Sequence, residues 1–89
     1  MTELVVKAGP QAPEPSVTRL ASLLVELERS LSADPPDKVV LADASDDALA
    51  AALVATKLLI AVEAAPGAID PLSSNGRLIA QLATYTSAA

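Results

Sequence analysis

Cysteine and histidine are both absent from this 89-residue sequence. The lack of cysteine excludes a disulfide-stapled secreted scaffold and any thiolate metal or redox site. Without these two residue types, acid–base catalysis near neutral pH needs a carboxyl, lysine or tyrosine group with a displaced pKa. No G-x-S-x-G elbow or G-x-x-x-x-G-K loop is present, and three glycines are too few for a nucleotide cradle. The sequence therefore predicts a protein that is not an enzyme and binds no cofactor or metal.

Phenylalanine and tryptophan are also missing, and Tyr85 is the only aromatic residue, although 52% of the chain is hydrophobic. The core must therefore be built from Leu, Val, Ile and Ala, and Ala has the highest helix propensity of all residues. We expect an all-α fold. A chain of this length buries roughly 60–65% of its extended surface, so oligomerisation would supplement a small core.

Positive charge is scarce: six Lys and Arg stand against eleven Asp and Glu, for a net charge of −5. This balance opposes unaided binding to DNA, RNA or anionic lipid. The N-terminus carries Glu3 and too short an apolar run for a signal peptide. We expect a cytoplasmic protein.

The first fifteen residues contain three prolines within six positions and predict a flexible, extended leader, with a single helical domain over 16–89. The alternative for Leu4 to Val6 is an edge strand added to another element. Ser16 is suited to cap a first helix over 16–32. Its apolar residues follow a 3-4-3-4 spacing: Val17, Leu20, Leu24, Leu27 and Leu31.

Pro35 and Pro36 end that helix. The apolar run within 38–42 can be a short strand or a loop packed over the helices. We favour the loop, because only Leu4 to Val6 could pair with it and an isolated two-stranded ribbon is barely stable.

The second predicted helix covers 46–65, between the capping segment DASDD and the stop signal Pro66-Gly67. Five Asp between positions 34 and 47 raise the possibility of a calcium loop, but the glycine and terminal glutamate of an EF-hand loop are missing. Capping explains the last three of these acids more simply.

Residues 48–65 of this predicted helix, ALAAALVATKLLIAVEAA, form a stretch long enough to cross a bilayer. However, eight of its eighteen residues are Ala and Lys57 lies in its middle, where insertion costs roughly 2.5–3.5 kcal/mol. We expect no membrane insertion. A helix that is apolar on most sides must be covered on most sides, and part of it is then left for another chain. The candidate interface residues are Leu49, Leu53, Lys57 and Ile60, with Asp46 and Asp47 as acidic partners for Lys57 in a head-to-tail assembly.

A third helix is predicted over 71–86, starting at Pro71 or only at Ser74 because Asn75-Gly76 interrupts its first turn. The four helical Lys and Arg are scattered, so one chain would read DNA poorly. A ring of many copies could still collect one Arg from each. Arg19 and Arg77 are the candidate nucleic-acid contacts.

The order of these segments is characteristic: MTELVVKAGP with its Pro-rich leader, the Leu/Glu helix LASLLVELERSL, the Ala/Leu helix, the acid–proline step at Ile69-Asp70-Pro71, and SSNGRLIAQLATYT. It resembles the small-terminase-type proteins of phages and prophages of high-GC actinobacteria. The resemblance implies a non-enzymatic homo-oligomer in the host cytoplasm. Such a protein recognises phage DNA and recruits a large packaging ATPase.

Two other functions fit the sequence. One is a helical docking or regulatory module that binds a single partner protein, a role that suits the extended leader and the apolar run at 38–42. The other is a structural phage component. Self-association would favour the packaging subunit, and its absence would favour the docking module.

Overall fold

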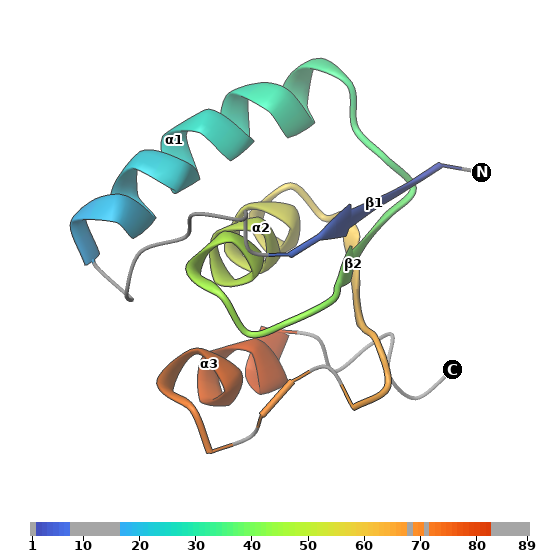
Figure 1. Cartoon of the computed structure of the whole chain (residues 1–89). Coiled ribbons are helices and arrows are strands. Elements are labelled where there is room, and N and C mark those ends of the chain that lie inside the picture. Colours follow the sequence, from blue (N-terminus) through green and yellow to red (C-terminus); the bar gives the residue numbers. More distant parts are fainter. Residues whose placement is uncertain (1, 8–16, 68, 71, 83–89) are drawn as a thin grey trace.

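A computed structural model describes residues 2–7, 17–67, 69–70 and 72–82. Three strands alternate with three helices along this part of the chain (Figure 1). In order they are β1 (Glu3–Val6), α1 (Val17–Ala33), β2 (Lys38–Leu41), α2 (Asp46–Lys57), β3 (Ala61–Ala64) and α3 (Ser74–Leu82). The protein is therefore an α/β fold, and the predicted all-α, three-helix domain is wrong.

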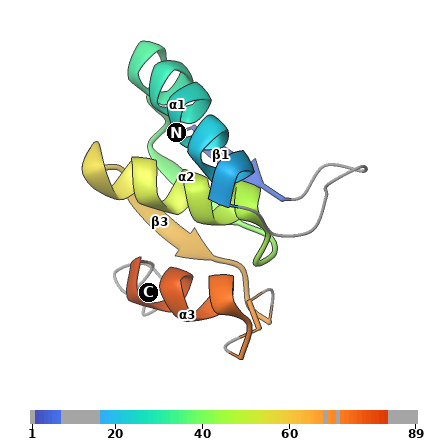
Figure 2. The ribbon, with the colours of Figure 1, turned by 90° about the vertical axis from the view of Figure 1, so that its left-hand side faces the viewer.

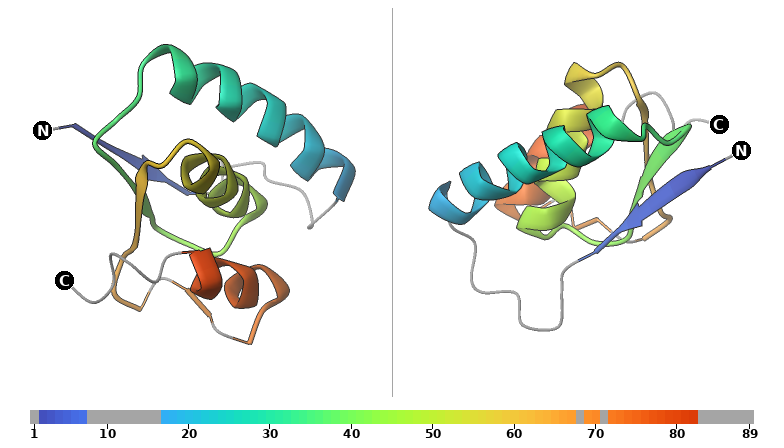
Figure 3. Two further views of the ribbon diagram at one scale, coloured as in Figure 1. Left: turned by 180° about the vertical axis from the view of Figure 1, so that it is seen from behind. Right: turned by 90° about the horizontal axis from the view of Figure 1, so that it is seen from above.

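The three strands form one parallel sheet in the order β1-β2-β3. Leu4 pairs with Val39, which in turn pairs with Val62. Because the strand order never reverses, the crossovers through α1 and α2 place both helices on the same face. Figure 1 and the opposite view on the left of Figure 3 show all three helices on one side of the strands.

The N-terminal segment is part of this sheet, so the prediction of a flexible leader is wrong for Glu3–Val6. The edge-strand alternative describes it correctly, and residues 8–16 lie outside the described part of the chain. Lys38–Leu41 is likewise a strand and not a packed loop. The objection to a two-stranded ribbon fails because β3 supplies a third strand.

The third strand comes from the stretch predicted as one helix over 46–65. The helix ends at Lys57, and Leu59 then has φ 61°, a left-handed conformation that is unusual for a leucine. The Ile60 N–H donates to the Ala55 carbonyl at 2.8 Å and closes the turn. The helix prediction is therefore wrong beyond Lys57, because pairing with β2 overrides the local preference of an Ala- and Leu-rich segment.

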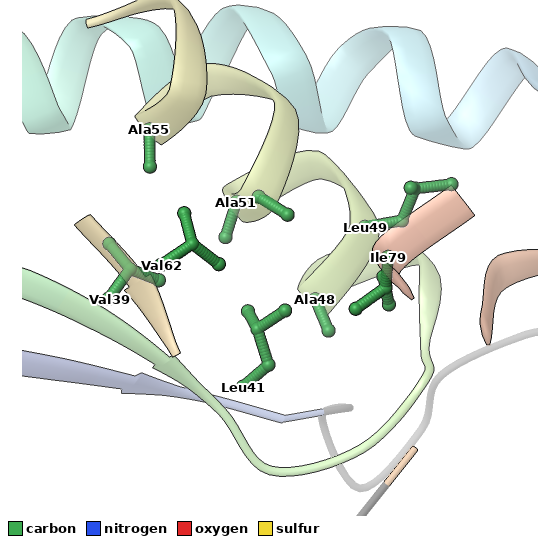
Figure 4. Close-up of a cluster of buried hydrophobic side chains, with 9 residues drawn as sticks. Val39, Leu41, Ala48, Leu49, Ala51, Ala55, Val62 and Ile79 are labelled. Atoms are coloured by element: carbon green, nitrogen blue, oxygen red, sulfur yellow. The ribbon is translucent and has the colours of Figure 1, made fainter. Parts of the chain in front are cut away.

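The core lies between the sheet and α2 (Figure 4). Alternation along β2 turns Val39 and Leu41, both fully buried, toward the helices. The side chains that α2 directs to the sheet are mostly alanines, and small side chains let the helix backbone approach the strands closely. The fully buried alanines are Ala48, Ala50, Ala51, Ala52 and Ala55.

α2 is the central helix, with α1 on one side of it and α3 on the other (Figure 2). α3 begins at Ser74, the later of the two predicted starts, and the described part of this helix ends at Leu82 and not at residue 86. A Cβ atom at Gly76 would overlap the carbonyl oxygen of Asp70, so only glycine fits this close approach. Within the described residues, no helix has both the length and the hydrophobicity required to span a bilayer.

Candidate protein-interaction surfaces

The carboxyl ends of parallel strands are the usual place for a ligand in α/β proteins, at the point where the strand order reverses. Here the order runs 1-2-3 without a reversal, so no crevice opens between helices on opposite faces. The polar groups at this edge bond to one another. Ser45 Oγ caps α2 by accepting from the Ala48 N–H at 3.2 Å, and Asp43 Oδ1 accepts from the Ser45 N–H at 3.0 Å. This confirms the capping role predicted for the acidic segment.

The N-termini of α2 and α3 are joined at the same edge by a buried amide. Asn75 Nδ2 donates to Asp46 Oδ1 and to the carbonyl of Ala44, each at 3.0 Å. Asn75 and Asp46 are both only 7% exposed. A buried amide and carboxylate that satisfy each other hold two helices together and present little to a ligand.

The predicted interface residues occupy different environments. Leu49 is buried at 2% exposure and Asp46 at 7%, while Leu53 and Ile60 are half-buried against the core. Lys57 is exposed at the end of α2. Leu53 and Lys57 are therefore the pair that lies together at an open surface, and the sixth residue, Asp47, is bound within the chain.

Of the predicted nucleic-acid contacts, Arg19 forms an ion pair with Asp47 at 3.0 Å that links α1 to the first turn of α2. Arg77 is exposed on α3. The structure places the two arginines on different helices and does not bring them together in one chain. DNA binding through an assembled ring remains a prediction.

Among the described residues, one face of the sheet carries no helix, and an ionic cluster around Lys38 of the middle strand lies on it. Lys38 Nζ lies 3.0 Å from Glu63 Oε2 on β3 and 3.5 Å from Glu3 Oε2 on β1. The hydrogen bond to Glu63 and its negative charge raise the pKa of Lys38 above the usual 10.5, and Glu3 adds a smaller effect in the same direction. Val5, on the same face, is 56% exposed. The lysine thus links all three strands across an open sheet face.

A groove of about 370 Å³ runs between α1 and α2. Its lining is mainly apolar, with one acid from α1 and one base from α2: Leu24, Val25, Glu28, Leu53, Val54, Lys57 and Leu58. Val25 is 57% exposed. The right-hand view of Figure 3, from above, shows α1 crossing over α2.

A second apolar groove, of about 420 Å³, lies beside β3 and the end of α3. Leu59, with 93% exposure, stands at this groove. Its other lining residues are Thr56, Ile60, Ala61, Val62 and Leu82.

Sequence reasoning missed the ionic cluster, and it missed that Glu28 lines the same groove as Lys57. Glu63 was assigned to a helix, so its cross-strand contact with Lys38 could not be foreseen. The available signal was the alternation of Ile60 and Val62 around Ala61, which is typical of a strand. Glu28 lies off the apolar stripe of its helix, and the sequence of a single helix does not show which neighbouring element such a residue faces.

Comparison with known proteins yields no match to any family model, any curated protein or any solved structure.

Proposed function

We propose that this chain is a non-enzymatic subunit that self-associates and acts by holding protein chains together. The observation that carries the proposal is the incomplete burial of α1. Of the 17 residues in this helix only Leu31 is buried. Leu24 of its apolar stripe, together with the neighbouring Val25, lines the groove shared with α2.

The apolar stripe of α1 contains more large apolar side chains than a helix exposed to solvent usually carries. Three of its leucines, Leu20, Leu24 and Leu27, are half-buried, and so is Leu23 beside them on α1. An amphipathic helix normally buries its apolar side against the core. Contiguous apolar surface that stays exposed next to a groove marks a protein interaction site. Association would bury the remainder of the stripe.

The resemblance to small terminases gives this proposal a specific form, in which the oligomer recruits a packaging ATPase. The charges favour this protein-binding role over direct DNA binding by one chain. Arg19 is engaged by Asp47, and Lys38 is held between two glutamates. A net charge of −5 adds a repulsion toward phosphate.

The test is the molar mass of the full chain in solution, measured by size-exclusion chromatography with light scattering over a wide range of concentrations. We expect a mass that rises from one chain to a defined multiple as the concentration increases. A single-chain mass at every concentration would contradict self-association and favour a docking module that binds one partner.

DNA binding is tested separately by fluorescence anisotropy of labelled duplex at two salt concentrations. We expect no salt-sensitive binding under conditions in which the chain is a monomer. Binding that appears only when the chain is assembled would support the complete packaging role. Tight binding by the monomer would contradict our assignment of a protein-binding role.

A further inference from the structure

We propose that the groove between α1 and α2 is a twofold self-association surface, in which Glu28 of each copy pairs with Lys57 of the other. This inference rests on the proposed self-association and states where it occurs. Two copies would then place their α1 and α2 helices together as a four-helix layer. The sheets would lie on the outside of the pair.

The charges of the groove are self-complementary. Glu28 comes from α1 and Lys57 from α2, both side chains are exposed, and both line the groove. Neither has an ionic partner among the described residues, whose ion pairs involve other side chains. In a twofold interface, if one residue contacts a second across the axis, the second contacts the first. One acid and one base at the same groove therefore form two ion pairs when a second copy is added.

The apolar part of the groove supplies the contact area. Leu24 and Leu53 in its lining are half-buried, and Val25 on α1 is 57% exposed. A helix of this length extends over about 26 Å, and α2 continues the surface beside it. Covering this strip removes apolar side chains from water, which is the main favourable term in association.

The open sheet face is a poorer surface for a second copy. It carries two glutamates and one lysine, so two such faces would bring together surfaces of equal negative charge. Its strands have four residues each, and three of them cover on the order of 200 Å². A standard interface needs roughly 800 Å² from each partner.

The groove beside β3 gives no comparable orientation. Its lining contains no charged residue among those described, so nothing there fixes how a second copy would be placed. The α1–α2 groove is the surface where apolar area and complementary charge coincide.

The experiment measures the dimer dissociation constant of the full chain by sedimentation equilibrium. Glu28→Lys and Lys57→Glu should each raise it about tenfold, because each turns two attractive pairs into two repulsive ones. The double variant Glu28→Lys/Lys57→Glu should return to within about threefold of the wild type. Glu26→Lys is the matched control, since Glu26 is an exposed acid on α1 outside the groove lining. We expect it to change the constant no more than about twofold.

A further variant, Val25→Asp, places a charge at the apolar part of the groove and should give a monomer at the concentrations where the wild type is dimeric. Val25 is exposed within one chain, so its replacement should leave the far-UV circular dichroism spectrum unchanged. A dimer that tolerates Val25→Asp, or responds to Glu28→Lys only as it does to Glu26→Lys, overturns this interface and leaves self-association standing. Single variants that weaken the dimer without rescue by the double variant also overturn the pairing. A wild type that stays monomeric overturns the proposed function and the interface together.

Discussion

Within the described part of the chain, the two longest helices, α1 and α2, have opposite relations to the core. α2 buries eight of its 12 residues, whereas α1 buries one of 17. Yet α1 has the regular apolar stripe expected of a core-facing helix, and α2 is apolar on nearly all sides. The difference arises from their neighbours. α2 has α1, α3 and the sheet around it, and α1 packs mainly on α2.

This contrast shows that an amphipathic pattern predicts which side of a helix is turned inward, but does not predict how much of that side is covered. Coverage depends on the number of elements that surround the helix. The alanines of α2 let several elements approach it at once, as Figure 4 shows for the sheet side. Among the described elements, the leucines of α1 pack mainly against α2, so part of their surface stays exposed.

The largest difference between the two helices should appear when a leucine is truncated in each. We expect Leu49→Ala in α2 to lower the free energy of unfolding by about 2–5 kcal/mol, because Leu49 is 2% exposed and its loss leaves a cavity. Leu23→Ala in α1 removes a half-buried side chain and should cost about 1 kcal/mol.

Both values come from urea unfolding at one low protein concentration, with unchanged denaturant slopes as the check on two-state behaviour. Equal losses of unfolding free energy for the two variants would contradict the difference in burial between α1 and α2. They would show that α1 is covered in solution as completely as α2.

A smaller difference is expected for enlarging an alanine in each helix. Ala51 of α2 is fully buried and faces the sheet, so Ala51→Leu should destabilise the chain by about 1–3 kcal/mol through overpacking. Ala33, the exposed last residue of α1, should accept leucine with a change of at most about 0.5 kcal/mol. Thermal unfolding of the two variants side by side measures the difference. A tolerated leucine at position 51 would mean that α2 and the sheet are less tightly packed than the structure has them.

The smallest expected effect on stability comes from the open sheet face, which, like α1, is largely exposed to solvent. Because Glu63 and Glu3 raise the pKa of Lys38, the charged lysine contributes stability that is fully present below pH 10.5. That contribution is lost as the pH rises through the elevated pKa of the folded state. We therefore expect wild type to be more stable than Lys38→Met by a constant small margin from neutral pH to about pH 10, and the margin to disappear above it.

Urea midpoints of both proteins across this range give the measurement. The two proteins differ only at position 38, so the difference isolates Lys38. A margin that persists at pH 12 would show that the methylene groups of the lysine, and not its charge, stabilise the sheet.

Local signals in the sequence predicted the parts of the fold that depend on local chemistry. The first helix, the cap of α2 within DASDD and the later of the two starts expected for α3 follow from capping residues, prolines and apolar spacing. The sheet could not be found in this way, because each of its strands has four residues and pairs with a segment far away in the sequence. β3 was hidden within an Ala- and Leu-rich stretch that by itself favours a helix.

The candidate surface was predicted in part. Leu53 and Lys57 were assigned to an interface from the apolar character of their helix, and the structure places both at the groove. Leu49 belongs to the interior of the single chain, which sequence alone could not tell from an interface position. Glu28 could be assigned to this surface only once the packing of α1 on α2 was known.

The left-handed turn at Leu59 has a consequence for the order in which the chain folds. Up to Lys57 the local sequence and the final structure agree, so this helix can form early. Beyond Leu59 the strand exists only if β2 is already in place, since its partners Val39 and Val40 come from a distant segment whose closure has an entropic cost. The unusual conformation of one exposed leucine thus separates a helix whose hydrogen bonds are local from a strand that uses the sheet as a template.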